Sequence, residues 1–139
     1  MANNKIMGCG FHHVALQTRD LEQSLKFYID GLGFTLRAKW RGASGKEIAL
    51  VDIGNGSYFE LFSDGEPKEQ TEICAGTFFH LALAVSDTRQ AFARAVACGG
   101  VPHVEPKEVA LGEHGELLAA LSFVLGPDGE QIEFFEEHA

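Results

Sequence analysis

Two pairs of ionisable side chains recur along this chain of 139 residues in closely similar surroundings. His13 begins the run HVALQTRD, and His80 begins the run HLALAVSD 67 positions later. Glu60 lies in the run GSYFELF, and Glu133 lies in GEQIEFF 73 positions later. The chain therefore contains two copies of one unit, and each copy carries one such histidine and one such glutamate.

Imidazole and carboxylate groups are ligands for divalent first-row metals such as Zn, Ni, Co, Mn or Fe. All four residues fall in apolar runs, where an unpaired charge is costly to bury and a metal ion supplies the counter-charge. We therefore expect a metal site made of His13, Glu60, His80 and Glu133. The alternative is that each is a structural residue with an ordinary hydrogen-bond partner.

Each copy is expected to form a strand, a helix and then three strands. The first strands are expected over Gly10–Gln17 and Thr77–Val85, and Asp20 and Asp87 follow as helix N-caps. The later strands are expected over Phe34–Trp40, Glu47–Ile53, Tyr58–Phe62, Val101–Val104 or Glu108–Leu111, Leu118–Leu125 and Gln131–Glu136.

Strand alternation separates the histidines that could face a ligand from the others. In both copies the histidine shares its face with a small alanine two positions later, which leaves room beside the imidazole. His12 is expected to point away from His13, since neighbouring residues of a regular strand face opposite sides. The remaining histidines are expected in loops or in the C-terminal tail, namely His103, His114 and His138.

Length and charge narrow the class of protein. We expect a single domain over residues 1–139, built from modules at about 10–66 and 77–137. The net charge of −9 and the absence of a basic block argue against nucleic acid as a partner, and no apolar run is long enough to cross a membrane. Three dispersed cysteines predict no disulfide framework, which is typical of a cytoplasmic protein.

At these residues the chain resembles the vicinal oxygen chelate superfamily, which includes glyoxalase I, methylmalonyl-CoA epimerase, extradiol dioxygenases, and fosfomycin and bleomycin resistance proteins. The resemblance extends from Phe11 to Glu136. It implies an α+β fold of two tandem βαβββ modules, with a curled mixed sheet around a metal cleft, a small-molecule substrate and a homodimer. The segments that carry it are His13–Leu16, Asp20–Tyr28, Leu32–Phe34, Phe59–Phe62, His80–Leu83 and Gly126–Phe135.

The ligand set distinguishes the branches of this superfamily. By resemblance, His13, His80 and Glu133 match ligands found in most metal-bearing branches, and Glu60 matches the fourth ligand of the glyoxalase and epimerase branches. This implies a metal-dependent lyase or isomerase that transfers a proton next to a carbonyl, through an enediolate stabilised by the metal. Glu60 or Glu133 would move the proton. The alternatives are an acyl-CoA epimerase of the methylmalonyl type, an iron-dependent extradiol dioxygenase and a non-catalytic, resistance-type binding protein.

Two features bear on the substrate. Glu47 matches the position of a catalytic glutamate in the epimerase branch and is a third candidate for proton transfer. Glyoxalase I has a basic residue in its first strand that contacts glutathione, and this chain has Gln17 there. The nearby cations that could serve an anionic portion of the substrate are Arg19, Arg37, Lys39 and Arg41.

Overall fold

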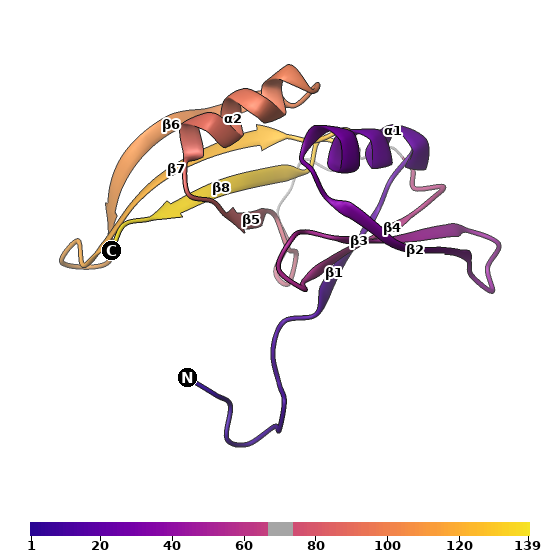
Figure 1. Cartoon of the computed structure of the whole chain (residues 1–139), viewed down its shortest axis with the longest axis horizontal. Coiled ribbons are helices and arrows are strands. Elements are labelled where there is room, and N and C mark those ends of the chain that lie inside the picture. Colours follow the sequence, from indigo (N-terminus) through magenta and orange to yellow (C-terminus); the bar gives the residue numbers. More distant parts are fainter. Residues whose placement is uncertain (67–73) are drawn as a thin grey trace. The chain divides into compact units, whose positions relative to one another are not determined.

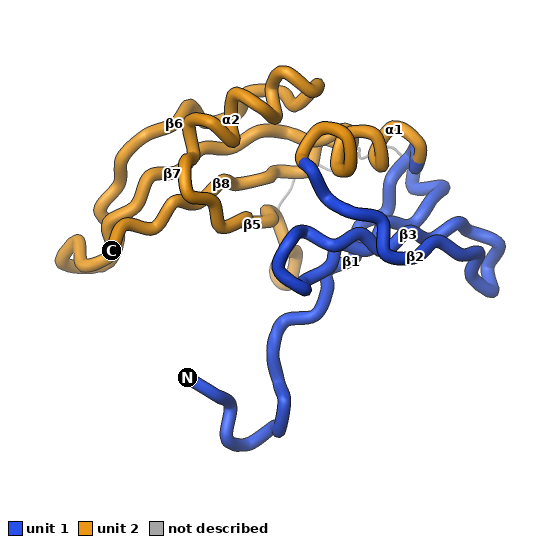
Figure 2. The backbone as a smooth tube through the Cα atoms, viewed as in Figure 1, with its two compact units in different colours: residues 1–21, 33–66 blue, residues 22–32, 67–139 orange. Residues whose placement is uncertain are grey.

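The computed structural model describes residues 1–66 and 74–139, which form two compact units (Figures 1 and 2). Unit 1 comprises residues 1–21 and 33–66, and unit 2 comprises residues 22–32 and 67–139. Each unit contains a mixed four-stranded sheet, as expected for an α+β fold of two βαβββ modules. No helix in the described part of the chain is long and apolar enough to span a membrane.

The sheet of unit 1 has the strand order β1-β4-β3-β2. Its strands are β1 (His13–Gln17), β2 (Thr35–Arg41), β3 (Glu47–Asp52) and β4 (Tyr58–Phe62). The first strand runs parallel to β4, and the other pairings are antiparallel. One face of the sheet carries buried apolar side chains such as Val51, Phe59 and Leu61. Alternation therefore directs His13 and Glu60 to the other face.

The sheet of unit 2 repeats this topology with the order β5-β8-β7-β6. Its strands are β5 (Leu81–Ala84), β6 (Val101–Leu111), β7 (Leu117–Leu125) and β8 (Gln131–Glu137), and α2 (Thr88–Ala97) packs on β6, β7 and β8. The expected cap of α2 is confirmed, because the Asp87 carboxylate accepts a hydrogen bond of 3.0 Å from the Gln90 backbone N–H. Ala95 of α2 is buried, and so are Val124, Ile132 and Phe134 of the sheet.

The helix of the first repeat belongs to the second unit. It begins as α1 (Leu21–Leu25) and continues as a π-helical segment, Lys26–Gly31, which the periodicity of the sequence does not predict. The Tyr28 hydroxyl donates a hydrogen bond of 2.6 Å to the Glu130 carboxylate in the turn between β7 and β8. The Arg94 side chain of α2 donates to the backbone carbonyls of Asp30 and Gly31. Residues 22–32 are thus an integral part of unit 2.

The structure corrects three expectations about the second repeat. The two short alternatives at 101–104 and 108–111 are both parts of the single strand β6, whose alternation is interrupted by irregularities after Pro102 and Val104. His103 was expected in a loop and instead lies within β6. The first strand, expected from Thr77, begins only at Leu81, so His80 lies immediately before β5.

Candidate metal centre

The first His–Glu pair lies on the exposed face of the unit 1 sheet. Glu60 lies opposite Ala15 across the parallel β1–β4 pairing, and His13 precedes Ala15 by two residues on the same face. The His13 Nε2 atom is 3.7 Å from the Glu60 Oε1 atom. The small alanine lets the two longer side chains approach each other above it.

Unit 2 repeats this arrangement in the same register. Glu133 lies opposite Ala82 across the β5–β8 pairing, and His80 precedes Ala82 by two residues. The His80 Nε2 atom is 3.2 Å from the Glu133 Oε2 atom. Glu133 is buried, with only 7% of its surface exposed, so its charge requires a nearby cation or donor.

Both pairs have a geometry that fits two ligands of one metal ion. Ligand atoms bound at about 2.1 Å with tetrahedral or octahedral angles lie about 3.0–3.4 Å apart. The Nε2-to-Oε distances are 3.7 Å and 3.2 Å, close to this range. Within the described ranges 1–66 and 74–139, no three His, Cys, Asp or Glu side chains are grouped so that they could hold an ion. Each unit brings together one histidine and one glutamate.

His12 lies beside His13 instead of pointing away from it, which corrects the sequence expectation. The strand β1 begins only at His13, so regular alternation does not extend back to residue 12. The Nδ1 atoms of the two histidines are 2.8 Å apart, and the His12 ring is 5.1 Å from the Tyr58 ring between centroids. At the corresponding position of the second repeat, the Phe79 ring contacts the His80 ring at 5.3 Å.

Glu47 is not brought together with the other candidate residues. Glu47 begins β3, and Ala49, two positions later, lies on the buried face of the sheet. Leu50 lies opposite Glu60 and therefore belongs to the other face. The Glu47 Oε1 atom is 3.5 Å from the Arg41 Nη2 atom, in a largely exposed ion pair. Alternation therefore separates Glu47 from the face that carries Glu60.

One basic residue of each unit reaches these faces through matching β-bulges. Arg37 is among the cations that the sequence analysis offered for an anionic substrate, and His103 is a residue that it did not place at the site. In β2, the pairing shifts between Leu36 and Ala38, so Arg37 is the inserted residue, and it donates a hydrogen bond to the Tyr58 hydroxyl. In β6, the pairing shifts between Pro102 and Val104. His103 is inserted there, and its ring is 6.4 Å from Phe123, whose ring also contacts His80.

The pairing partners show that this bulge is part of the repeat. In unit 1 it lies opposite Val51 and Leu50, and in unit 2 it lies opposite Val124 and Phe123, with the same 73-residue offset that relates Glu60 to Glu133. Bulges are enriched next to functional sites because they re-aim a side chain. Arg37 and His103 are 66 positions apart, which is neither offset of the repeat, so the sequence alone does not match them and the pairing partners do.

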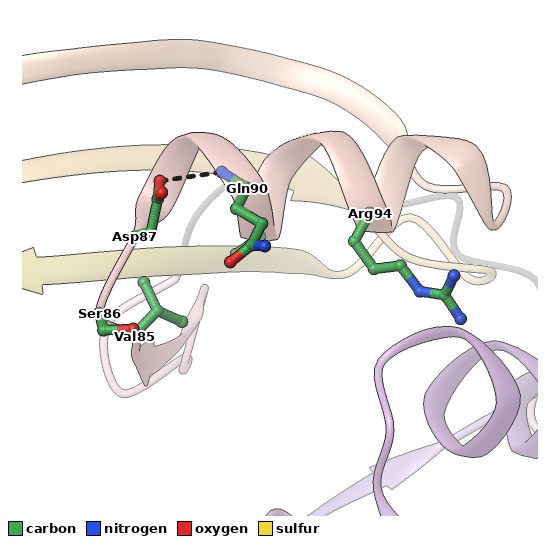
Figure 3. Close-up of a pocket in the computed structure, with 6 residues that line it drawn as sticks. Val85, Ser86, Asp87, Gln90 and Arg94 are labelled. Carbon is green, nitrogen blue, oxygen red and sulfur yellow. Dashed lines mark hydrogen bonds between the residues drawn. The ribbon is translucent and has the colours of Figure 1, made fainter.

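A separate hollow of about 440 Å³ lies in unit 2, at the start of α2. Figure 3 shows its labelled side chains, with the Asp87 cap and with Arg94 further along the helix. None of the four proposed ligands lines it, so it is distinct from both His–Glu pairs. Its lining residues are Val85, Ser86, Asp87, Gln90, Ala91 and Arg94.

Comparison with known proteins identifies the family. The model of the Glyoxalase/Bleomycin resistance protein/Dioxygenase superfamily matches residues 10–134 of this chain. The chain belongs to this superfamily. The match covers both His–Glu pairs and both bulges, and it confirms the family expected from the sequence.

Individual relatives are similar over nearly their full length. The Escherichia coli protein YaeR, described as uncharacterized, is 30% identical over 138 residues, covering 91% of this chain and 95% of its own. The lactoylglutathione lyase of Haemophilus influenzae is 30% identical over 134 residues, covering 89% and 90%. A solved structure of a glyoxalase family protein from Enterococcus faecalis has a TM-score of 0.75 at 21% identity, covering 94% of this chain and 100% of that one. The last of these supports the superfamily fold.

Proposed function

We propose that this superfamily member is a metal-dependent lyase or isomerase of the glyoxalase-like type, which moves a proton next to a carbonyl of a small-molecule substrate. The observation that carries the proposal is the duplicated His–Glu pair, with the same register and similar donor distances in both units. The likeness to a lactoylglutathione lyase supports it. The proposed form in solution is a homodimer.

The proposed ligands are His13, Glu60, His80 and Glu133, binding one divalent ion of Zn, Ni, Co, Mn or Fe. Two donors are too few to hold such an ion firmly, and four nitrogen and oxygen donors are a familiar set for these metals. We therefore propose that both pairs contribute to the same ion, whether they come from one chain or from two copies.

The chemistry that such an ion supplies is polarisation of the substrate carbonyl, which favours loss of the neighbouring proton. The carboxylates of Glu60 and Glu133 are the groups proposed to take up and return that proton, a contribution of about 10²–10⁴-fold for a well-placed acid or base. The two imidazoles hold the ligand geometry.

Metal binding is the direct test. We expect the wild-type protein to bind about one divalent ion per chain, and Glu60→Gln and Glu133→Gln each to lower the affinity by more than tenfold, measured by titration against a chelator. Glu47→Gln is the matched control, because Glu47 belongs to the face of the sheet opposite the one that carries Glu60. This variant should bind metal as the wild type does. Wild-type affinity in both ligand variants would overturn the site.

Activity then separates the reaction classes. The metal-loaded protein is incubated with the hemithioacetal of methylglyoxal and glutathione and, separately, with an α-chiral acyl-CoA. Turnover of the first supports the lyase, and turnover of the second supports the epimerase. Oxygen uptake with Fe(II) and a catechol would instead support the dioxygenase, and a protein that binds no metal would support the non-catalytic binder.

Mixing the two ligand variants tells which chains build the site. If one ion takes a pair from each of two copies, mixed dimers of Glu60→Gln and Glu133→Gln contain one intact site, and metal binding returns. If both pairs come from one chain, mixing restores nothing.

A further inference from the structure

Arg37 is the inserted residue of the bulge in β2, and the bulge determines where its side chain goes. Leu36 pairs with Val51 and Ala38 pairs with Leu50, so Arg37 has no partner in the register. Val51 lies on the buried face and Leu50 lies opposite Glu60 on the other face. The side chain of Arg37 extends over this second face as far as β4, since it contacts Tyr58 there.

Tyr58 holds the guanidinium of Arg37 in place. The Arg37 Nη1 atom donates a hydrogen bond of 2.6 Å to the Tyr58 hydroxyl, and the guanidinium carbon is 5.3 Å from the centre of the Tyr58 ring. Tyr58 is itself buried and lies opposite His13 in the β1–β4 pairing. The cation is therefore fixed on the same face as the His13–Glu60 pair, by a residue directly beside that pair.

The charge of Arg37 is not neutralised by any carboxylate in the described part of the chain. By contrast, Arg41 on the same strand lies 3.5 Å from Glu47, and Arg89 lies 3.9 Å from Glu108. Arg94 likewise has no carboxylate partner among the ion pairs of the described residues, but its guanidinium is satisfied by the backbone carbonyls of Asp30 and Gly31. The Arg37 Nη1 group is bonded to Tyr58, which leaves the Nε and Nη2 edge, a pair of parallel donors that matches the two oxygens of one carboxylate.

We propose that Arg37 binds a carboxylate of the substrate and so selects anionic over neutral substrates at the His13–Glu60 face. This inference rests on the proposed function for the identity of the face as a substrate site. It assigns substrate charge recognition to a bulge residue of β2, and Tyr58 is the residue that positions it.

Ligand binding tests the inference without requiring turnover. The probes are 3-(propylthio)propanoate and its primary amide, which differ only in the carboxylate. Trp40 is the single tryptophan, and its fluorescence reports binding. Trp40 pairs with Ile48, and Ile48 pairs with Phe62. All three side chains therefore belong to the face that carries Glu60. We expect the wild type to bind the carboxylate about tenfold more tightly than the amide, as is typical of hydrogen bonds to a charged group.

Variants of Arg37 and Lys39, two cations of β2, are compared for their preference between the two probes. Arg37→Gln should weaken carboxylate binding about tenfold and leave amide binding unchanged, and Arg37→Lys should keep part of the preference, since lysine retains the charge without the paired donors. Lys39→Gln is the control. Lys39 pairs with the buried Ala49, so it belongs to the face of the sheet opposite the one that carries Glu60. This variant changes the net charge equally and should retain the wild-type preference.

The outcomes separate this inference from the proposed function. If the wild type binds metal but Arg37→Gln keeps the preference, or loses affinity equally for both probes, the role of Arg37 is overturned and the metal proposal stands. If the wild type binds no metal but the preference disappears with Arg37, the role of Arg37 is supported and the metal proposal fails. Loss of the preference in Lys39→Gln as well would also overturn the inference, because net charge alone would explain it.

Discussion

The Tyr28 hydroxyl and the Glu130 carboxylate, 102 positions apart in the chain, are joined by a hydrogen bond of 2.6 Å inside unit 2. Tyr28 is fully buried on the π-helical segment of the first repeat, and Glu130 lies three residues before Glu133 in the second. The repeat gives this contact no counterpart, because Ala95 and Ser57 occupy the matching positions. The bond therefore makes the two copies unequal.

Replacing Tyr28 by Phe should lower the free energy of unfolding by about 1–3 kcal/mol near pH 8, because the half-buried Glu130 carboxylate loses the donor to its Oε2 atom and keeps the Asp128 N–H at its Oε1 atom. Burial and the nearby Glu130 raise the pKa of Tyr28 well above its usual value of 10.0. The stability that this group contributes is full below pH 10 and lost as the pH rises toward the folded pKa. Denaturant unfolding should show that the difference in free energy of unfolding between wild type and variant becomes smaller above pH 10. A difference that stays constant would contradict this.

Replacing Glu130 by Gln should alter the pH dependence of stability on the acidic side. Burial raises the pKa of Glu130 from its usual value of 4.5, despite the opposing hydrogen bond from Tyr28. Its contribution to stability is therefore full below pH 4.5 and lost as the pH rises through the folded pKa. Unfolding free energies measured from pH 4 to pH 7 should shift progressively in favour of the variant. The idea fails if the difference between the two proteins does not change with pH.

Replacing His12 by Phe copies the residue that the second repeat has at this position, Phe79. Coordination of a metal by the His13 Nε2 atom requires a hydrogen on Nδ1, and the Nδ1 atom of His12, 2.8 Å away, is placed to accept it. The variant should fold normally and bind metal about tenfold more weakly, as measured by chelator competition. His114→Phe, in an exposed turn, should bind as the wild type does. Equal affinities in all three proteins would refute this role of His12.

Replacing Thr88 by Val should destabilise unit 2 by about 2–5 kcal/mol. The buried Thr88 hydroxyl donates to the Phe134 carbonyl at 2.8 Å and lies 2.7 Å from the Ser122 hydroxyl, so the valine leaves two buried polar groups without this partner. Thr88→Ser retains the hydroxyl and should lose much less. Thermal unfolding distinguishes the two, and similar losses would mean that the methyl group matters more than the hydroxyl.

Strand alternation predicted the parts of the fold in which pairing is regular. The strand Tyr58–Phe62 has the predicted bounds, and the strand starting at Gln131 extends one residue further than expected, to Glu137. Both carry alternating side chains between well-marked turns, and both place their glutamate opposite an alanine. The repeat made these pairs visible, because the same residue types recur at two constant offsets.

The irregular parts could not be predicted in this way. An inserted residue in a strand breaks the alternation, so the stretch 101–111 gave two short alternative strands, with His103 assigned to a loop, although it is one bulged strand. A π-helical segment of six residues is too short for its hydrophobic spacing to be told apart from that of an α-helix. The position of His12 depends on where β1 begins, which is among the least reliable features of a sequence-based prediction.

The membership of residues 22–32 in unit 2 means that a cut between the two repeats would divide this unit. Tyr28 would fall in one half and its hydrogen-bond partner Glu130 in the other. The same cut would separate the Arg94 guanidinium from the carbonyls of Asp30 and Gly31. Neither half of the chain would therefore contain a whole unit 2.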